Sequence, residues 1–433
     1  MKFTKMSLVA ALLVGSSAFA IENTKVSGNA NLFYTTTAGG ANGADMFNKD
    51  ASAADAGVNL NITTDLTKND TITVSAGAGA TMISTLGLEN NLVSNVFGGA
   101  HGATTGTGAS YGSALGGAKV EDAAWLNEAW VAATVSNTTL KLGRMELDTP
   151  LAFTETWSIE KNTFEAIVAI NTDIPDTTLV GAYVGNGNGS EAFGQNLRGT
   201  VVTDSNAAAP HYNLAAGEIV NENGSFGTFG TDGAYAVGVI NNSIKPLMVQ
   251  AWYYDLTRLA TAYWLQADLN VDGILAGAQF TSTSLKSGNI VAPTATDASG
   301  TFALMAGYEM KDTFVAKLSY SQTSDKGVLH GANTATASGA SKLYTEAWWN
   351  YGKITQADTS AFNLTVEAPV KDIVDLGLYA TMADCENDAG DMTEVTLTAS
   401  HSFGSLDTTA AVIYTDANDD KSGMLQAYLT YNF

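Results

Sequence analysis

The chain has 433 residues, and its 43 Asp and Glu against 20 Lys and Arg give a formal net charge of −23. This acidity argues against a nucleic-acid partner, because binding the phosphate backbone requires positively charged side chains. A single cysteine, Cys385, excludes an internal disulfide framework. After the first twenty residues the sequence contains no apolar run long enough for a membrane-spanning helix.

The chain begins with the features of a secretory signal peptide. Lys2 and Lys5 precede an apolar run from Leu8 to Val14, and Ala18-Phe19-Ala20 provides the small residues of a cleavage site. We therefore expect residues 1–20 to be removed on export. With no linker or abrupt change of composition after them, we expect residues 21–433 to form a single domain.

Apolar and polar residues alternate with a period of two in segments of roughly ten residues, the pattern of a transmembrane β-barrel. Tyr263, Leu265 and Leu269 fall on one face of such a segment, and Gln266 and Asp268 fall on the other. The same alternation occurs in residues 301–310, 313–322 and 362–367. A soluble β-sandwich also alternates, but its core face carries larger side chains than the Ala, Val and Leu found here. We therefore expect an all-β chain folded as an antiparallel transmembrane barrel, with one face of each strand in lipid and the other in water.

Eight short turn-like segments separate these strands, and they imply about eighteen strands if both chain ends lie on the periplasmic side. The predicted periplasmic turns are LTKND (66–70), VSNTT (135–139), TDIPDT (172–177), NNSIKP (241–246), NVDG (270–273), MKDT (310–313), PVKD (369–372) and FGSLD (403–407).

Longer segments alternate with the turns, as expected for external loops of a barrel. The longest are residues 82–122, 185–232 and 324–358, which we expect outside the membrane or folded into the pore. Shorter external hairpins are predicted at residues 255–258, 384–391 and 416–421, so that Cys385 becomes an external-loop thiol.

The segment QAYLTYNF (426–433) reads as the closing strand. Ala427, Leu429, Tyr431 and Phe433 should face lipid, with the aromatic rings in the periplasmic interfacial belt. An unpaired strand edge is not tolerated in a bilayer, so this strand should pair with the first one, near residues 25–35. A final Phe433 on such a strand also looks like the signal that outer-membrane assembly machinery recognises.

The stretch KLGRMELDTPLAFTETWSIEKNTFEAIVA (141–169), with the signal peptide, NTKVSGNANLFY (23–34) and the final YNF (431–433), resembles the Campylobacter-type major outer membrane proteins, which are related to OprD-like porins. The match is strongest over residues 1–35 and 140–186. The resemblance implies an eighteen-stranded, homotrimeric, cation-preferring diffusion channel, with calcium as a ligand in the constriction of some members. It also implies that residues 144–165 form a loop that folds inward and narrows the channel.

Charged residues in that inward loop are the candidate constriction and selectivity residues, because carboxylates at a narrow point concentrate cations and repel anions. They are Arg144, Glu146, Asp148, Glu155, Glu160, Lys161 and Glu165. The alternative is a solvated external loop whose acids have no specific role. Strand alternation adds the candidate pore-wall residues Glu128, Lys141, Asp268, Glu309, Lys317, Glu367 and Glu394. With only three arginines in the chain, a dense arginine ladder across the lumen is not expected.

A weak calcium site formed by Glu146, Asp148 and Glu155 is a further hypothesis. The segment DANDDKSG (416–423) spaces its acids like the start of a calcium loop, but Lys421 stands where an EF-hand has glycine. We therefore interpret it as a polar hairpin tip. The Trp348-Trp349 pair admits three roles: a sugar-stacking platform, a membrane-interface anchor or a loop-packing element.

Catalytic motifs are missing from the sequence. The four histidines are widely scattered, and neither a G-x-S-x-G elbow nor an H-E-x-x-H pair is present. We therefore expect a non-enzymatic porin of the outer membrane that passes ions and small hydrophilic solutes, prefers cations and needs no cofactor. Two alternatives are a substrate-specific OprD-like channel and a surface adhesin with a barrel anchor, which single-channel conductance would separate.

Overall fold

The computed structural model describes residues 22–40, 43, 45–48, 51–84, 86, 95–96, 104–105, 119–120, 123–157, 159–189, 226–230, 232–257, 259–286, 297–327, 329–335, 340–371, 373–386 and 390–433. The predicted signal peptide lies outside these residues. Within the described parts of the chain, no helix has the length and apolar character needed to cross a membrane.

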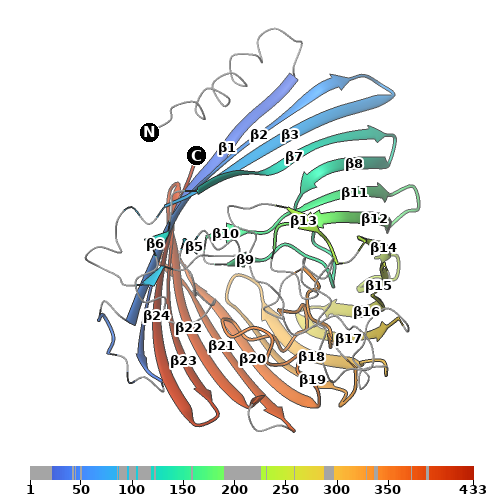
Figure 1. Cartoon of the computed structure of the whole chain (residues 1–433). Helices are drawn as coiled ribbons and strands as arrows, with labels where there is room; N and C mark the ends of the chain where they lie inside the picture. The colour runs from blue at the N-terminus through green and yellow to red at the C-terminus, as the bar shows by residue number, and fades with distance from the viewer. Residues whose placement is uncertain are drawn as a thin grey trace, which may run out of the picture.

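The described strands form a closed antiparallel barrel (Figure 1). A 20-stranded sheet includes two short members, β4 (Asn95–Val96) and β13 (Gly227–Thr228), and the other eighteen pair in chain order around the ring. The barrel strands are β1 (Glu22–Gly39), β2 (Ser52–Lys68), β3 (Ile72–Ser84), β7 (Ala123–Val135), β8 (Thr138–Met145), β11 (Phe164–Asn171), β12 (Thr177–Gly187), β14 (Ala234–Asn241), β15 (Leu247–Leu256), β16 (Ala260–Val271), β17 (Ile274–Leu285), β18 (Thr301–Met310), β19 (Phe314–Thr323), β20 (Thr359–Val370), β21 (Val374–Cys385), β22 (Met392–Phe403), β23 (Leu406–Ala417) and β24 (Asp420–Asn432). Outside the barrel wall, β5 (Thr104–Thr105) pairs with β6 (Lys119–Val120), and β9 (Thr156–Trp157) pairs with β10 (Glu160–Lys161).

The ring closes between its first and last strands, as the sequence predicts. β1 and β24 are antiparallel neighbours in an unbroken register that includes Leu32↔Leu429 and Tyr34↔Ala427. Every strand edge along the wall is thereby paired, which a hydrocarbon environment requires.

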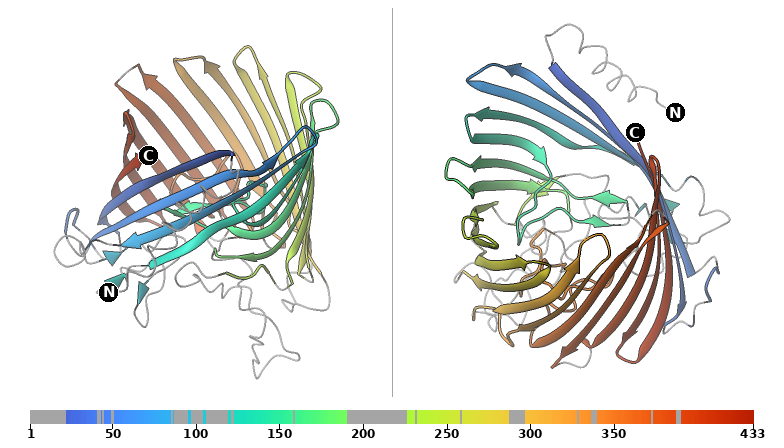
Figure 2. Two further views of the ribbon diagram at one scale, coloured as in Figure 1. Left: turned by 90° about the horizontal axis from the view of Figure 1, so that it is seen from above. Right: turned by 180° about the vertical axis from the view of Figure 1, so that it is seen from behind.

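The eight predicted turns are confirmed, and each joins two neighbouring strands. They connect β2–β3, β7–β8, β11–β12, β14–β15, β16–β17, β18–β19, β20–β21 and β22–β23, and they lie at one end of the tilted strands (Figure 2). We call this the turn end and the opposite end the loop end.

Alternation along the strands separates an apolar outer face from an inner face, as predicted. On β24, Leu429 is 41% exposed on the outer face, as is Phe433 (53%) directly after the strand, whereas Gln426 on the inner face is fully buried. Tyr263 and Leu265 on β16 are exposed on the same outer side, while Trp264 is buried. Because side chains alternate between the faces of a strand, the outer positions form a continuous apolar band.

Part of the interior is apolar, which the alternation pattern alone does not predict. Inward residues of β11, β15 and β16, such as Phe164, Trp252 and Trp264, form one buried cluster with Leu151 and Leu343 from two loop-end connections. Removing a large side chain from such a cluster costs about 2–5 kcal/mol. The connections are therefore held against the wall by packing as well as by hydrogen bonds.

Cys385 corrects a prediction. It is the last residue of β21 rather than a loop thiol, and its side chain is buried beside Thr359, whose hydroxyl lies 3.0 Å from the sulfur.

Candidate functional site

Two loop-end connections contact inward-facing side chains of the barrel wall. They are the β19–β20 connection (residues 324–358) and the β8–β11 connection (residues 146–163). In Figure 1, β9 and β10 of the second connection lie within the outline of the strand ring. The surfaces of these two connections and of the wall around them form the candidate site.

Glu394 on β22 anchors the β19–β20 connection. Its carboxylate accepts hydrogen bonds from the backbone N–H groups of Trp348 (2.8 Å), Trp349 (3.0 Å) and Asn350 (2.8 Å), and from the Asn350 side chain (2.7 Å). Glu394 is only 1% exposed. The predicted wall acid does face inward, but its charge is used to hold backbone donors instead of facing the open lumen.

A second anchor lies on β16 and β17. Tyr344 donates its hydroxyl hydrogen to Asp268, and its backbone N–H donates to Gln279 (3.0 Å). The Gln279 side chain also donates to the Lys342 carbonyl (2.9 Å). Asp268, another predicted wall acid, is thus a partner of the same connection.

The tryptophan pair has a loop-packing role, one of the three alternatives that the sequence left open. The Trp349 ring stacks 6.4 Å from Phe33 on the inner face of β1, and the Trp348 ring lies 6.3 Å from Tyr379 on β21. The two rings therefore pack the connection against two wall strands, β1 and β21.

Glu346 organises the β19–β20 connection from within. Its carboxylate accepts hydrogen bonds from the Ser341 hydroxyl (2.7 Å), the Ser341 N–H (2.8 Å) and the Ala347 N–H (3.0 Å). Burial raises the pKa of Glu346 to about 7, although these hydrogen bonds act in the opposite direction.

The β8–β11 connection packs on the β19–β20 connection as well as on the wall. Asn333 donates to the Phe153 carbonyl (2.9 Å) and to the Glu155 carboxylate (2.7 Å), and the Thr334 hydroxyl donates to the Leu151 carbonyl (2.6 Å). The Leu151 N–H in turn donates to the inward hydroxyl of Tyr254 on β15 (3.3 Å). The two connections consequently form one packed unit.

The predicted constriction residues are distributed over several partners. Glu146 is paired with Lys161, and Asp148 is paired with Lys342 of the other connection. The Asp148 side chain is 93% exposed. Glu160 is buried against Asp55 of β2.

Arg144 and Glu165 correct the predicted constriction set. Arg144 shares a strand face with Leu142, and Glu165 shares one with Ile167, and both apolar residues are exposed on the outer side. The Arg144 Nε donates to Glu165 at 2.8 Å, and Asn186 also donates to Glu165 at 2.5 Å. These two residues form an ion pair on the outside of the barrel because alternation in β8 and β11 continues up to the ends of the strands.

The remaining predicted wall residues lie on the inner face. Glu128 accepts from the Trp130 indole N–H (3.3 Å), and the Lys141 ammonium lies 4.2 Å from the centre of the same ring. Glu367 accepts from the Tyr379 hydroxyl at 2.7 Å, and Glu309 accepts from Asn270 at 3.3 Å. Lys317 lies on the inner face of β19.

A metal site is not assembled from the predicted acids. Glu146, Asp148 and Glu155 bond to Lys161, Lys342 and Asn333 respectively. Among the residues that the structure describes, no group of three His, Cys, Asp or Glu side chains could hold a metal ion.

The sequence reasoning missed Asn333, Tyr254 and Tyr344, which fix the connections to each other and to the wall. Alternation could have placed Tyr254 on the inner face of β15. Asn333 and Tyr344 lie in irregular segments that carry no comparable signal.

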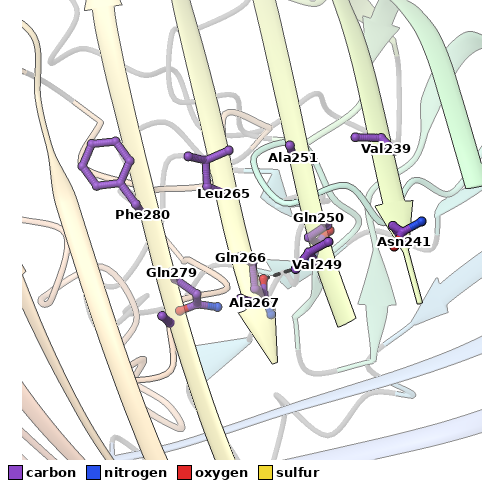
Figure 3. A pocket seen from close by; sticks show the side chains of 11 residues that line it. Val239, Asn241, Val249, Gln250, Ala251, Leu265, Gln266, Ala267, Gln279 and Phe280 are labelled. Carbon is purple, nitrogen blue, oxygen red and sulfur yellow. Dashed lines mark hydrogen bonds between the residues drawn. The ribbon is translucent and has the colours of Figure 1, made fainter. Parts of the chain in front are cut away.

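The structure also shows a depression of about 420 Å³ on the membrane-facing side of the wall. It is lined by small side chains such as Ala251 and Ala267 and by the larger Leu265 and Phe280 (Figure 3). Gln250 and Gln266 behind it are hydrogen bonded to each other at 3.0 Å. This depression faces outward and does not belong to the candidate site.

Comparison with known proteins matches the fold to solved outer-membrane channels. OccAB1 of Acinetobacter baumannii has a TM-score of 0.69 at 12% identity, over 96% of this chain and 98% of that one. OccK8 (OprE) of Pseudomonas aeruginosa has a TM-score of 0.64 at 14% identity, over 96% and 99%. OpdK of the same organism, solved with vanillate, has a TM-score of 0.65 at 12% identity, over 95% and 99%. No family model and no curated protein sequence matches the chain.

At these identities the similarity shows the fold, which is that of the Occ-type outer-membrane porins. A closed eighteen-stranded barrel with an apolar outer face has its place in an outer membrane.

Proposed function

We propose that this protein is an outer-membrane porin whose lumen conducts ions and small hydrophilic solutes by passive diffusion. The observation that carries the proposal is the closed barrel, apolar outside, with two connections fixed to its inner wall by Glu394, Asp268 and Tyr254. Connections held in this way narrow the lumen at a defined level and leave a water-filled path beside them.

We further propose that the channel prefers cations. Asp148 carries an exposed carboxylate at the candidate site, and the inner wall adds Glu128, Glu309 and Glu367. Their field raises the local concentration of cations within a low-dielectric wall. The only arginine among the described residues, Arg144, lies on the outer face, so it does not offset these acids within the lumen.

A substrate-specific channel is the second candidate function. It is favoured by the packed unit of two connections, which restricts the lumen more than a single inward loop would. It is also favoured by the fold shared with OpdK, whose solved structure contains vanillate.

Bilayer recording with the purified protein tests both candidates. Stepwise conductance that rises in proportion to salt supports a diffusion channel, and block of the current by a low concentration of one solute supports a specific one. Absence of steps would contradict both and leave an adhesin with a barrel anchor.

Three narrower proposals follow the resemblance to Campylobacter-type proteins. They are assembly as a homotrimer, recognition of Phe433 by assembly machinery, and calcium binding by Glu146, Asp148 and Glu155, in which the ion would have to replace their present partners Lys161, Lys342 and Asn333. Crosslinking in native membranes, export of a Phe433→Ser variant and calcium-dependent melting test them in turn.

A further inference from the structure

Two carboxyl groups meet inside the barrel between β2 and the β9–β10 hairpin. Asp55 on β2 and Glu160 on β10 are each 1% exposed, and their side chains are in hydrogen-bonding contact with each other. Among the described residues, the backbone N–H of Ala56 donates to Asp55, and no N–H or hydroxyl group donates to the carboxyl oxygens of Glu160. Two ionised carboxylates in this position would repel each other, so the contact requires a hydrogen on one of them.

The contact between Asp55 and Glu160 holds the β9–β10 hairpin against β2. β9 and β10 pair through Glu160↔Trp157 and Lys161↔Thr156, and Ile159 beside them packs over Gly57 of β2. A side chain at residue 57 would place its Cβ 3.1 Å from the Ile159 Cδ1 atom. Ile159 and Glu160 therefore rest directly on the wall at β2.

The base of the hairpin is held by hydrogen bonds that do not involve Asp55 or Glu160. The Thr163 hydroxyl donates to the Asn127 carbonyl of β7 (2.7 Å), and the Glu155 N–H donates to the Asn162 side chain (2.8 Å). With both ends of the segment bonded in this way, release of Ile159 and Glu160 would move the hairpin without unfolding the connection.

The charges around the pair do not neutralise it. Burial, and after it the neighbouring charge of Asp55, raises the pKa of Glu160 well above its ordinary value. Lys161 is bonded to Glu146, and this ion pair acts on Glu128. Opposite Asp55 in the sheet lies the uncharged Phe33 of β1.

We propose that Asp55 and Glu160 form a proton-dependent latch that holds the β9–β10 hairpin against β2, and that loss of the shared proton releases the hairpin into the lumen. In the closed latch one carboxylic acid donates its O–H to the other carboxylate. On opening, that proton passes to water and the two carboxylates separate. A test of the latch by channel conduction rests on the proposed porin function. A test by the protonation state of the two carboxyl groups does not.

The direction of the effect follows from proton linkage. Glu160 released into water ionises near its ordinary pKa, while latched Glu160 keeps its proton to higher pH, so the released state binds fewer protons. Between these two pKa values the ratio of released to latched molecules rises by up to about tenfold for each pH unit. Low pH favours the latched state.

Two measurements test the latch, each made on the wild-type protein and on the variants Asp55→Asn and Glu160→Gln. An amide at either position donates N–H to the remaining carboxylate and needs no titrating proton, so each variant should stay latched at all pH values. In wild-type protein, infrared spectra should show the carbonyl stretch of a buried carboxylic acid that disappears as the pH rises. That band should be missing in both variants and retained in Glu346→Gln, which removes a different carboxyl group whose pKa is also raised by burial.

In bilayers, wild-type current should show closures whose frequency rises with pH, and both variants should keep the low-pH behaviour throughout. Failure of one variant to fold leaves the other to decide. A wild-type channel with no pH-dependent closures, or closures removed by a chelator and not by acid, would overturn the latch and leave the porin function intact. Absence of any conductance together with the predicted infrared band would refute the porin function and not the latch.

Discussion

Gly28 and Phe433 join the two ends of the barrel wall. The Gly28 N–H donates to the Phe433 carbonyl at 2.9 Å, and the Phe433 N–H donates to the Gly28 carbonyl at 3.0 Å. The phenyl ring of Phe433 covers residue 28 so closely that a Cβ there would lie 2.7 Å from the ring. Glycine at this position leaves room for the final ring over the closing seam at the turn end.

Replacing Gly28 with valine should weaken the seam. The new side chain would collide with the Phe433 ring and with the Asn59 carbonyl, and overpacking of this kind costs about 1–3 kcal/mol. The melting temperature and the heat-resistant band of folded barrel on gels should both decrease. Gly423→Ala on β24 is the matched control, because nothing lies within 4 Å of its new Cβ. Equal losses in the two variants would contradict the role of the seam.

Glu394→Gln should loosen the β19–β20 connection. A glutamine amide presents an NH₂ group to backbone donors that now face a carboxylate, and each charged hydrogen bond contributes about 1.5–3 kcal/mol. Fluorescence of Trp348 and Trp349 should shift towards that of exposed indole, and current noise should increase. Glu309→Gln, on the same inner face, has Asn270 as its partner and should change neither signal. An unaltered Glu394→Gln spectrum would show that the connection is held by packing alone.

Stability should depend on pH through Glu346. Its pKa is about 7 in the folded protein against 4.5 for an ordinary glutamate, so the unfolded state loses its proton first as the pH rises. The stabilising effect of the proton is complete below about pH 4.5 and is lost up to about pH 7, and it amounts to roughly 3 kcal/mol. Melting curves across this range, compared with those of Glu346→Gln, measure it. A variant with the same pH dependence as wild type would assign the effect to another group.

Charge variants should change ion selectivity only where the charged side chain lies at the candidate site and not on the outer face. Asp148→Asn and Glu146→Gln should reduce cation preference, because both carboxylates lie in the β8–β11 connection. Arg144→Gln should leave the reversal potential unchanged and affect only stability, since its ion pair with Glu165 lies on the outer face. A large change of selectivity in Arg144→Gln would mean that this ion pair faces the lumen.

Alternation is a local property, and it predicted the parts of the fold that depend on neighbouring residues. The closing strand, all eight turns and the facing of Glu394 and Asp268 follow from it. The same rule, continued through Leu140 and Leu142, places Arg144 on the outer face. The prediction failed there because residues 144–165 were treated as one loop and the strand ends were not followed to Met145 and Phe164.

The partners of the inner-wall acids could not be predicted in this way. Glu394 is bonded to Trp348, which precedes it by 46 residues, and Asn333 is bonded to Phe153, which precedes it by 180. Such contacts depend on how two irregular connections fit together inside a curved wall. No periodic pattern in the sequence predicts these contacts.

The central claim is that the barrel encloses a cation-preferring aqueous path. The most direct test is the reversal potential of the purified protein in a planar bilayer with a potassium chloride gradient at neutral pH. We predict stepwise conductance with a reversal potential shifted towards that of potassium. Stepwise conductance with a shift towards chloride would contradict the selectivity, and a bilayer without current steps would contradict the channel itself.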